Sequence, residues 1–175
     1  MVNPDFAHTG ALLLREALPL ALWEDCRDKL REACWRPDVQ TGQAFAFDTC
    51  ALDLPELERW IAEQSAGLLG HAGLPGPAHF RGALKRLQAG PRYRFPWHRD
   101  HRGGRLLGMS INLSEAPCEG GVFEQRLRWE TEPSVRIHSK PRDLHLFDVS
   151  DSRRVHRVTQ LTAGSRVVFA GWWRA

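Results

Sequence analysis

The second half of this 175-residue chain is a series of short segments with strand-like composition, separated by turn-forming residues. Several segments alternate in polarity or are rich in β-branched and aromatic residues, and clusters of Gly, Pro, Asp and Ser stand between them. The expected strands are residues 79–88, 105–113, 121–129, 134–138, 143–149, 155–161 and 165–173. This number and spacing of short strands is typical of a small antiparallel β-sandwich or jelly roll.

Two helical patterns precede these strands. Apolar residues recur at helical spacing over residues 23–34, and a second pattern runs from Asp53 to the glycines and prolines of residues 70–77. Asp53 with Glu56 resembles a capping box, which favours a helix start at this point. We therefore expect two helices that pack on one side of the β structure.

The charge of the chain changes where its secondary structure changes. Residues 1–75 hold 6 basic and 12 acidic side chains, net −6, whereas residues 76–175 hold 18 and 9, net +9. Because the two boundaries coincide, we interpret them as layers of one domain rather than as two domains. The prediction is a single mainly-β domain over residues 1–175, with a helical support region (1–77) and a jelly-roll core (78–175).

Composition excludes several classes of protein. No apolar run approaches the roughly 20 residues that cross a membrane, and the polar N-terminus lacks the layout of a signal peptide. We therefore expect a cytoplasmic protein without membrane contact, of undetermined oligomeric state. The four cysteines lack metal-binding spacing, and Cys26 and Cys34 are expected to be small buried apolar residues of one helix face.

Three residues can form a metal site. His98 and Asp100 are two positions apart, so in a strand both side chains point to the same face. His156 follows 58 residues after His98, in the strand-like segment 155–161. Two histidines and one carboxylate form the facial triad that leaves open positions on Fe(II). His98, Asp100 and His156 are therefore the candidate metal ligands and catalytic residues.

A buried cation is expected beside this site. Arg166 lies ten residues after His156, and a turn at residues 162–165 would place its guanidinium deep in the same cavity. There it can hold a distal carboxylate in a bidentate fork. His145 alternates with Leu144 and Leu146, so it faces either the cavity or, as the favoured interpretation, the solvent. His101 is expected at the outer or rim side.

These motifs resemble, in their order, the Fe(II)/2-oxoglutarate-dependent oxygenases, in particular the prolyl-4-hydroxylase-like branch. The resemblance covers roughly residues 80–173, and the matching elements are residues 96–100, 110–114, 119–123, 140–147, His156, residues 164–166 and Trp172. It implies a double-stranded β-helix (a jelly roll, cupin-like) and the cofactors Fe(II), 2-oxoglutarate and O2. It also implies that His98, Asp100 and His156 bind iron and that Arg166 binds the C5 carboxylate of 2-oxoglutarate.

The chain departs from this branch at one place. Leu87-Gln88-Ala89-Gly90 stands where the branch often has a Tyr-x-x-Gly pattern, so the hydroxyl partner of Arg166 is open. The candidates are Gln88, Tyr93, Ser110 and Asn112. The branch usually has lysine where this chain has Arg166. The carboxylate of Asp100, which halogenating relatives lack, favours hydroxylation over chlorination.

The resemblance implies hydroxylation of an unactivated C–H bond in a small molecule, an amino-acid derivative or a peptide side chain. Residues 79–105 carry eight Lys and Arg against only one acidic residue, which fits either an anionic substrate or a solvated basic loop. One alternative is a nucleic-acid alkylation-repair demethylase, but seven residues separate Arg166 from Arg174 instead of that branch's five. Nucleic acid is therefore not the expected partner. A non-catalytic jelly-roll binding protein is the other alternative, and it leaves Arg166 unexplained.

Overall fold

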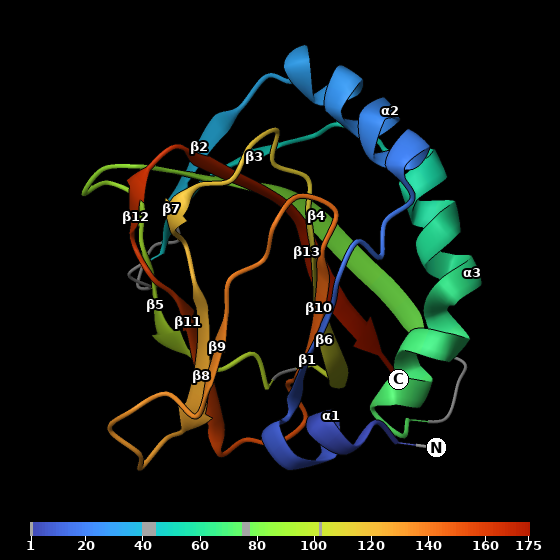
Figure 1. Cartoon of the computed structure of the whole chain (residues 1–175), viewed down its shortest axis with the longest axis vertical. Helices are drawn as coiled ribbons and strands as arrows, with labels where there is room; N and C mark the ends of the chain where they lie inside the picture. Colours follow the sequence, from blue (N-terminus) through green and yellow to red (C-terminus); the bar gives the residue numbers. More distant parts are fainter. Residues whose placement is uncertain (1, 40–44, 75–77, 102) are drawn as a thin grey trace.

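The computed structural model describes residues 2–39, 45–74, 78–101 and 103–175, which form three helices and thirteen strands (Figure 1). The helices are α1 (Pro4–Thr9), α2 (Leu20–Arg31) and α3 (Pro55–His71). The strands are β1 (Ala11–Leu14), β2 (Arg36–Val39), β3 (Ala46–Cys50), β4 (His79–Gln88), β5 (Phe95–His98), β6 (Arg105–Asn112), β7 (Glu119–Gly120), β8 (Phe123–Leu127), β9 (Val135–Ile137), β10 (Leu144–Asp148), β11 (Arg154–Val158), β12 (Leu161–Ala163) and β13 (Ser165–Arg174).

Two antiparallel sheets make the body of the fold. The larger has seven strands in the order β1-β10-β6-β13-β4-β3-β2, and the smaller has four in the order β5-β11-β8-β9. A short pair, β12-β7, completes the set. The smaller sheet lies on one side of the larger, and α2 and α3 lie on the other (Figure 1). This is the double-stranded β-helix with supporting helices that the sequence predicts.

The strands at the centre of the large sheet are buried on both faces, because helices cover one face and the small sheet covers the other. In β13, Phe169 and Trp173 belong to the apolar core beneath the helices, and Trp173 donates a hydrogen bond from Nε1 to Ser65 Oγ of α3 (3.1 Å). The alternate residues of the strand, including Arg166 and Trp172, face the small sheet. One strand therefore serves both the core and the interior between the sheets.

The segment 1–77 contains more than the two expected helices. It also forms α1, β1, β2 and β3, and the last two extend the large sheet beyond β4. The sequence of the short β3 shows no clear strand pattern. This segment is a strand because it pairs with β4, from Asp48↔Arg86 to Cys50↔Leu84.

Two local predictions in the N-terminal half were wrong. The N-cap of α3 is Leu54, whose apolar side chain cannot cap, and Glu56 pairs with Arg59 (2.6 Å), so the expected Asp53–Glu56 capping box does not form. Cys34 is exposed because α2 ends at Arg31, before the helix reaches it. Cys26 is buried as predicted. Among the described residues, no helix has the length and apolar character to span a bilayer.

Gly171 of β13 sits where a side chain would collide with the neighbouring strand. A Cβ there would meet the backbone of Arg81 and Gly82 of β4. We expect Gly171→Ala to lower the free energy of unfolding by about 1–3 kcal/mol, since the two strands would have to separate. Urea denaturation measures the change.

The matched control is Gly67→Ala in α3, where a Cβ would have no neighbour within 4 Å. Because alanine favours helix, this variant should keep or raise stability by up to about 1 kcal/mol. Equal stability of Gly171→Ala and the unchanged protein would contradict the close approach of β4 and β13.

Candidate active site

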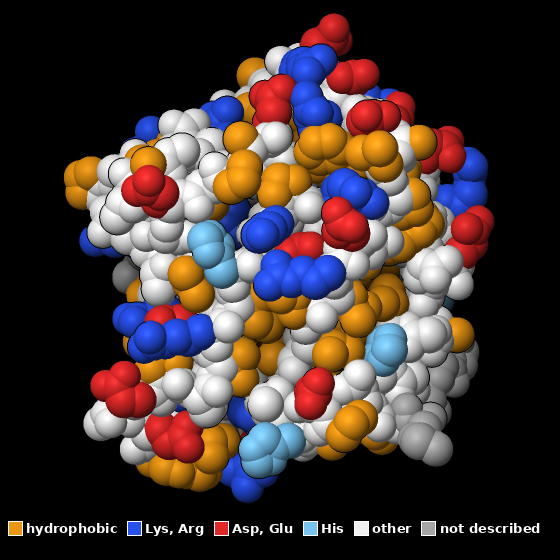
Figure 2. Space-filling view, in the orientation of Figure 1, with side chains coloured by type: hydrophobic (Ala, Val, Ile, Leu, Met, Phe, Trp, Pro, Cys, Tyr) orange, Lys and Arg blue, Asp and Glu red, His pale blue; other side chains and the backbone are white. Residues whose placement is uncertain are grey.

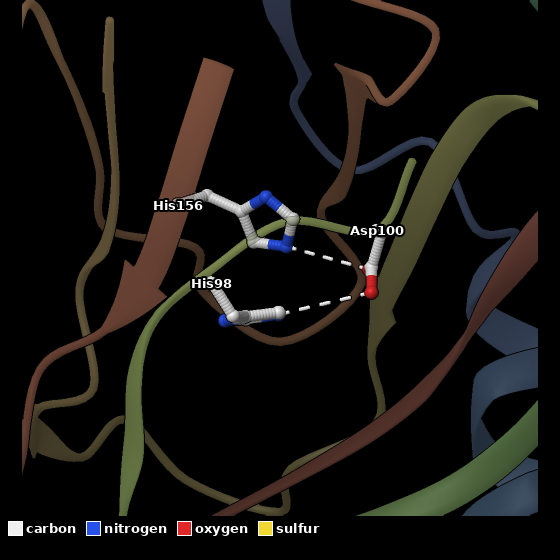
Figure 3. A group of neighbouring side chains, drawn as sticks. All are labelled: His98, Asp100 and His156. Carbon is white, nitrogen blue, oxygen red and sulfur yellow. Dashed lines mark ion pairs between the residues drawn. The ribbon is translucent and has the colours of Figure 1, made fainter. Parts of the chain in front are cut away.

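Three side chains converge between the two sheets. His98 ends β5 and His156 lies in the middle of β11, and the two are direct partners across this antiparallel strand pair. Asp100 follows His98 by two residues, and all three offer ligand atoms within 4.8 Å of one another. His156 Nε2 is 3.4 Å from Asp100 Oδ2, and His98 Nε2 is 3.9 Å from Asp100 Oδ1 (Figure 3). These atoms can hold one small cation.

The meeting of His98 and Asp100 does not arise as the sequence reasoning assumed. β5 ends at His98, so Asp100 lies beyond the strand and not on its alternating face. The bend after the strand brings the carboxylate back toward the imidazole (Figure 3). The predicted proximity is confirmed, but Asp100 lies beyond the end of β5, so strand pairing does not set its position.

His98 is fixed in the form that a metal requires. Its Nδ1–H donates to the carbonyl of Pro96 at 2.7 Å, which leaves the lone pair of Nε2 toward Asp100. Burial, and next the neighbouring His156, lower the pKa of His98 to about 4. The imidazole is therefore neutral at physiological pH, as a metal ligand must be.

Asp100 is held by two residues that the sequence did not single out. Trp172 Nε1 donates to Oδ2 at 2.9 Å, and Arg105 Nη1 donates to Oδ1 at 3.2 Å. The Arg105 guanidinium also lies 3.6 Å from the centre of the Trp172 ring. Burial alone would raise the pKa of Asp100, but His156, His98 and the Trp172 hydrogen bond together keep it below its usual value. The carboxylate is therefore charged and oriented.

Asp100 and His156 of the triad line a pocket between the sheets. Its walls are mainly apolar, formed by Phe47, Leu87, Phe95, Phe123, Phe147, Val158, Val168 and Trp172, and they also include Lys85, Asp100, Ser110, His145, His156 and Arg166. An apolar pocket with a few convergent polar groups is the usual form of a small-molecule site.

Arg166 is a buried cation in this pocket, with 4% of its surface exposed. Its guanidinium has no hydrogen bond or ion pair with any residue that the structure describes, and Nε is buried without a partner. Burial lowers its pKa to about 10, so it stays charged at neutral pH. An unpaired buried charge is costly, so this arrangement fits an anion that enters the pocket. Gly121 provides space for the Arg166 side chain, since a Cβ at this position would lie 3.1 Å from Arg166 Cδ.

Ser110 and Asn112 of β6 were both candidates for the hydroxyl partner of Arg166. Ser110 lines the pocket together with Arg166. The Asn112 amide is already committed, because Nδ2 donates to Ser139 O (2.9 Å) and Oδ1 accepts from Ser114 N (2.9 Å). Asn112 therefore orders the strand end and is not among the residues that line the pocket.

The other two candidates lie away from the pocket wall. The Tyr93 hydroxyl donates to Asp48 Oδ2 at 3.0 Å, and the Gln88 amide lies beside the Arg86 guanidinium. Since Leu87 is the residue paired with Arg166 across β4 and β13, its neighbour Gln88 points to the opposite face. Ser110 alone of the four candidates lines the pocket.

His145 was expected to face solvent, and this prediction was wrong. The residue is 2% exposed, pairs with Ser110 across β10 and β6, and lines the pocket. Its Nδ1 has no hydrogen-bond partner within the described chain. The small sheet covers this face of β10, which the local alternation of residues 144–146 could not reveal. His101 is exposed, as expected for a rim position.

The basic residues of segment 79–105 divide into two groups. Arg86 and Arg92 both pair with Asp48 of β3, at 2.8 and 3.4 Å, so one acid from outside the segment offsets one of their two positive charges. Lys85 instead lines the pocket, and Arg105 pairs with Asp100. Over the face in Figure 2, basic and acidic side chains stand beside one another rather than in a single patch. Arg102 of this segment lies outside the described residues.

A mostly β barrel-like fold with two imidazoles and a carboxylate around one point defines a class, the non-haem iron oxygenases with a facial triad. The comparison with family models agrees. Residues 84–174 match the model of the 2OG-Fe(II) oxygenase superfamily. The chain belongs to this superfamily, whose members use Fe(II), 2-oxoglutarate and O2.

Solved structures share the fold at low sequence identity. A 2OG-Fe(II) oxygenase family oxidoreductase from Burkholderia pseudomallei has a TM-score of 0.78 at 13% identity, covering 97% of this chain and 87% of that one. A Pseudomonas putida prolyl-4-hydroxylase has a TM-score of 0.68 at 19% identity, covering 97% and 95%.

A third structure is a Trichoplax adhaerens prolyl hydroxylase in complex with a peptide fragment of the hypoxia inducible factor oxygen degradation domain. It has a TM-score of 0.72 at 16% identity, covering 99% of this chain and 87% of that one. No curated protein matches the sequence.

His145 should make stability depend on pH. Burial, and next the charge of Arg166, hold its pKa well below the usual value, whereas the unfolded chain takes up a proton below about pH 6.5. The unfolded state then binds more protons, so the free energy of unfolding should fall as the pH is lowered from about 7.5 to 5. His145 should account for up to about 2 kcal/mol of this fall.

Urea unfolding of the metal-free protein at several pH values measures this effect. His145→Asn should show a shallower fall, since His98 still contributes but His145 does not. His8→Asn, a change at an exposed position of α1, should keep the original slope. A wild-type slope in His145→Asn would contradict the neutral, buried state of this imidazole.

Proposed function

We propose that His98, Asp100 and His156 bind Fe(II), that Arg166 binds the C5 carboxylate of 2-oxoglutarate, and that the enzyme hydroxylates a C–H bond of a small anionic substrate. The observation that carries this proposal is the unpaired, buried Arg166 guanidinium in the same pocket as the triad. A dicarboxylate that reaches both the metal and Arg166 satisfies the two groups at once.

The donor set suits ferrous iron. Two neutral imidazoles and one carboxylate on one side of the ion leave open positions on the other. When bound, Fe(II) with 2-oxoglutarate and O2 supplies the oxidising power for an unactivated C–H bond, with succinate and CO2 as coproducts. The chain itself supplies position and environment.

Each pocket residue has a definite part in this proposal. Pro96 orients His98 through its carbonyl, and Trp172 and Arg105 orient the Asp100 carboxylate. The phenylalanine rings keep water from the metal and from the substrate carbon, which strengthens the electrostatic hold of the buried charges. Ser110 is the proposed hydroxyl that accompanies Arg166 at the far carboxylate.

The substrate is proposed to be a small molecule, an amino-acid derivative or a peptide side chain. The Trichoplax adhaerens structure with its bound peptide supports the last of these as a class that this fold accommodates. The cytoplasmic location expected from the sequence stays a prediction, as does the single-domain organisation of residues 1–175.

Asp100→Ala tests the metal ligands. Anaerobic addition of Fe(II) and 2-oxoglutarate to the unchanged protein should give the visible charge-transfer band of the chelate, and this variant should lose both the band and succinate formation. The charged carboxylate contributes most of the attraction for the cation. Asp25→Ala, which removes an exposed carboxylate paired with Lys29 on α2, should behave like the unchanged protein. Full turnover in Asp100→Ala would refute the assignment.

Arg166→Met tests the cosubstrate site. Removing one partner of a buried charge pair costs about 2–5 kcal/mol, so the dissociation constant of 2-oxoglutarate should rise by roughly 30-fold to 4000-fold. The affinity for Fe(II) alone should stay within about threefold. Titration of the charge-transfer band with 2-oxoglutarate, and of the apoprotein with Fe(II), measures the two constants.

The same titration separates the candidate hydroxyl partners. Ser110→Ala should weaken the binding of 2-oxoglutarate by about 10-fold to 150-fold, because a hydrogen bond to a charged group contributes about 1.5–3 kcal/mol. Tyr93→Phe should leave the affinity unchanged, since that hydroxyl binds Asp48 outside the pocket. Unchanged affinity in Arg166→Met would overturn the cosubstrate assignment.

A further inference from the structure

A second cation, Lys85, lines the same pocket. Across the strand pair β4–β13, Leu87 lies opposite Arg166 and Lys85 lies opposite Val168. Lys85 therefore lies two residues along β4 from the position opposite Arg166, in the direction of Trp172. The Trp172 ring, which hydrogen-bonds Asp100, has its centre 5.3 Å from the Lys85 ammonium. This places Lys85 on the metal side of the pocket.

Aromatic rings surround the Lys85 ammonium. Nζ lies 5.2 Å from the centre of Phe47, and 5.3 Å from the centres of both Phe95 and Trp172. Such contacts hold a cation in place without neutralising it. Within the described chain, the ammonium has no hydrogen bond and no ion pair, and the residues outside the described ranges include no Asp or Glu.

Of the two acids that act on Lys85, Asp100 and Asp38, the one with the larger effect, Asp100, is already engaged by other residues. Burial lowers the pKa of Lys85, and Asp100 opposes that shift only in part. The Asp100 carboxylate accepts hydrogen bonds from Trp172 and Arg105 and faces both histidines. A lysine in this environment gains most from an anion that arrives with a ligand.

The sum of the charges in the pocket with Fe(II) and 2-oxoglutarate bound also indicates that Lys85 lacks an anionic partner. Fe(II), Arg166 and Lys85 carry four positive charges, and Asp100 contributes one negative charge. The 2-oxoglutarate dianion leaves one positive charge uncompensated. Arg166 accounts for the far carboxylate and the metal for the near one, so Lys85 is the cation without an assigned partner.

Resting on the proposed function, we propose that Lys85 is a specificity-determining residue that binds a carboxylate of the substrate, so that the substrate is an organic acid. Because the ammonium shares Trp172 with the metal ligand Asp100, the oxidised C–H bond lies only a few bonds from that carboxylate. A single ammonium among three aromatic rings fits a monoanionic carboxylate, whereas a phosphate dianion is normally met by several donors.

The test uses the full chain loaded anaerobically with Fe(II) and saturating 2-oxoglutarate. The probes are straight-chain monocarboxylates from propionate to octanoate and the matching primary amides. Perturbation of the charge-transfer band measures the dissociation constant of each probe. We expect the best acid to bind the unchanged enzyme at least tenfold more tightly than its amide.

Lys85→Gln and Lys85→Met should reduce this preference to within about twofold, and Lys85→Arg should keep part of it. In all three variants 2-oxoglutarate should still bind within about threefold of the original affinity. Using two uncharged variants guards against one that fails to fold. Lys140→Gln is the matched control, because it removes an exposed lysine outside the pocket and should preserve the full preference.

The possible failures differ from one another. A preference for acids that survives in the uncharged variants, or that is absent from the unchanged enzyme, would overturn the role of Lys85. A tenfold or larger loss of 2-oxoglutarate affinity in Lys85→Gln would overturn it as well, by assigning Lys85 to the cosubstrate. If the unchanged protein gives no charge-transfer band, the proposed function fails, and this inference fails with it.

Discussion

The alternation of side chains along β13 is the constraint on which the rest of the structure depends. Successive residues of a strand point to opposite faces, and in this strand one face completes the apolar core with Phe169 and Trp173. The other face carries Arg166 at one end and Trp172 at the other, toward Asp100. A shift of the register by one residue would turn the pocket residues of β13 toward the helices and the core residues toward the pocket. The packing of the helices against β13 therefore also fixes the position of the site.

The second constraint is electrostatic. The pocket holds two cations, Arg166 and Lys85, against the single carboxylate of Asp100. In water these charges would be solvated, but the sheets and phenylalanine rings remove that solvation, which is why burial lowers the pKa of Arg166, of Lys85 and of His98. The fold therefore keeps a pocket whose positive groups are best satisfied by anions.

The sequence predicted those site residues that can be recognised from residue type and spacing alone, without knowledge of which strands are adjacent. The spacing of His98, Asp100 and His156 and the position of Arg166 after a turn were enough to gather them into one pocket. It could not predict Trp172 as the partner of Asp100, or Lys85 and His145 as pocket residues. Their roles depend on which strands are adjacent and on what covers each face, and pairings such as His145↔Ser110 join parts of the chain far apart in sequence.

The basic segment 79–105 shows that an excess of basic residues in a sequence does not tell where their side chains lie in the fold. Its excess of arginine fitted either a basic mouth or a solvated loop. The structure divides the segment, because Asp48 from β3 pairs with Arg86 and Arg92, while Lys85 points inward among aromatic rings. A charge at the surface is screened by salt, but one inside a low-dielectric pocket acts at close range. Under the proposed function, the selectivity for an anion would come from the half-buried Lys85 ammonium in the pocket rather than from the exposed guanidinium groups.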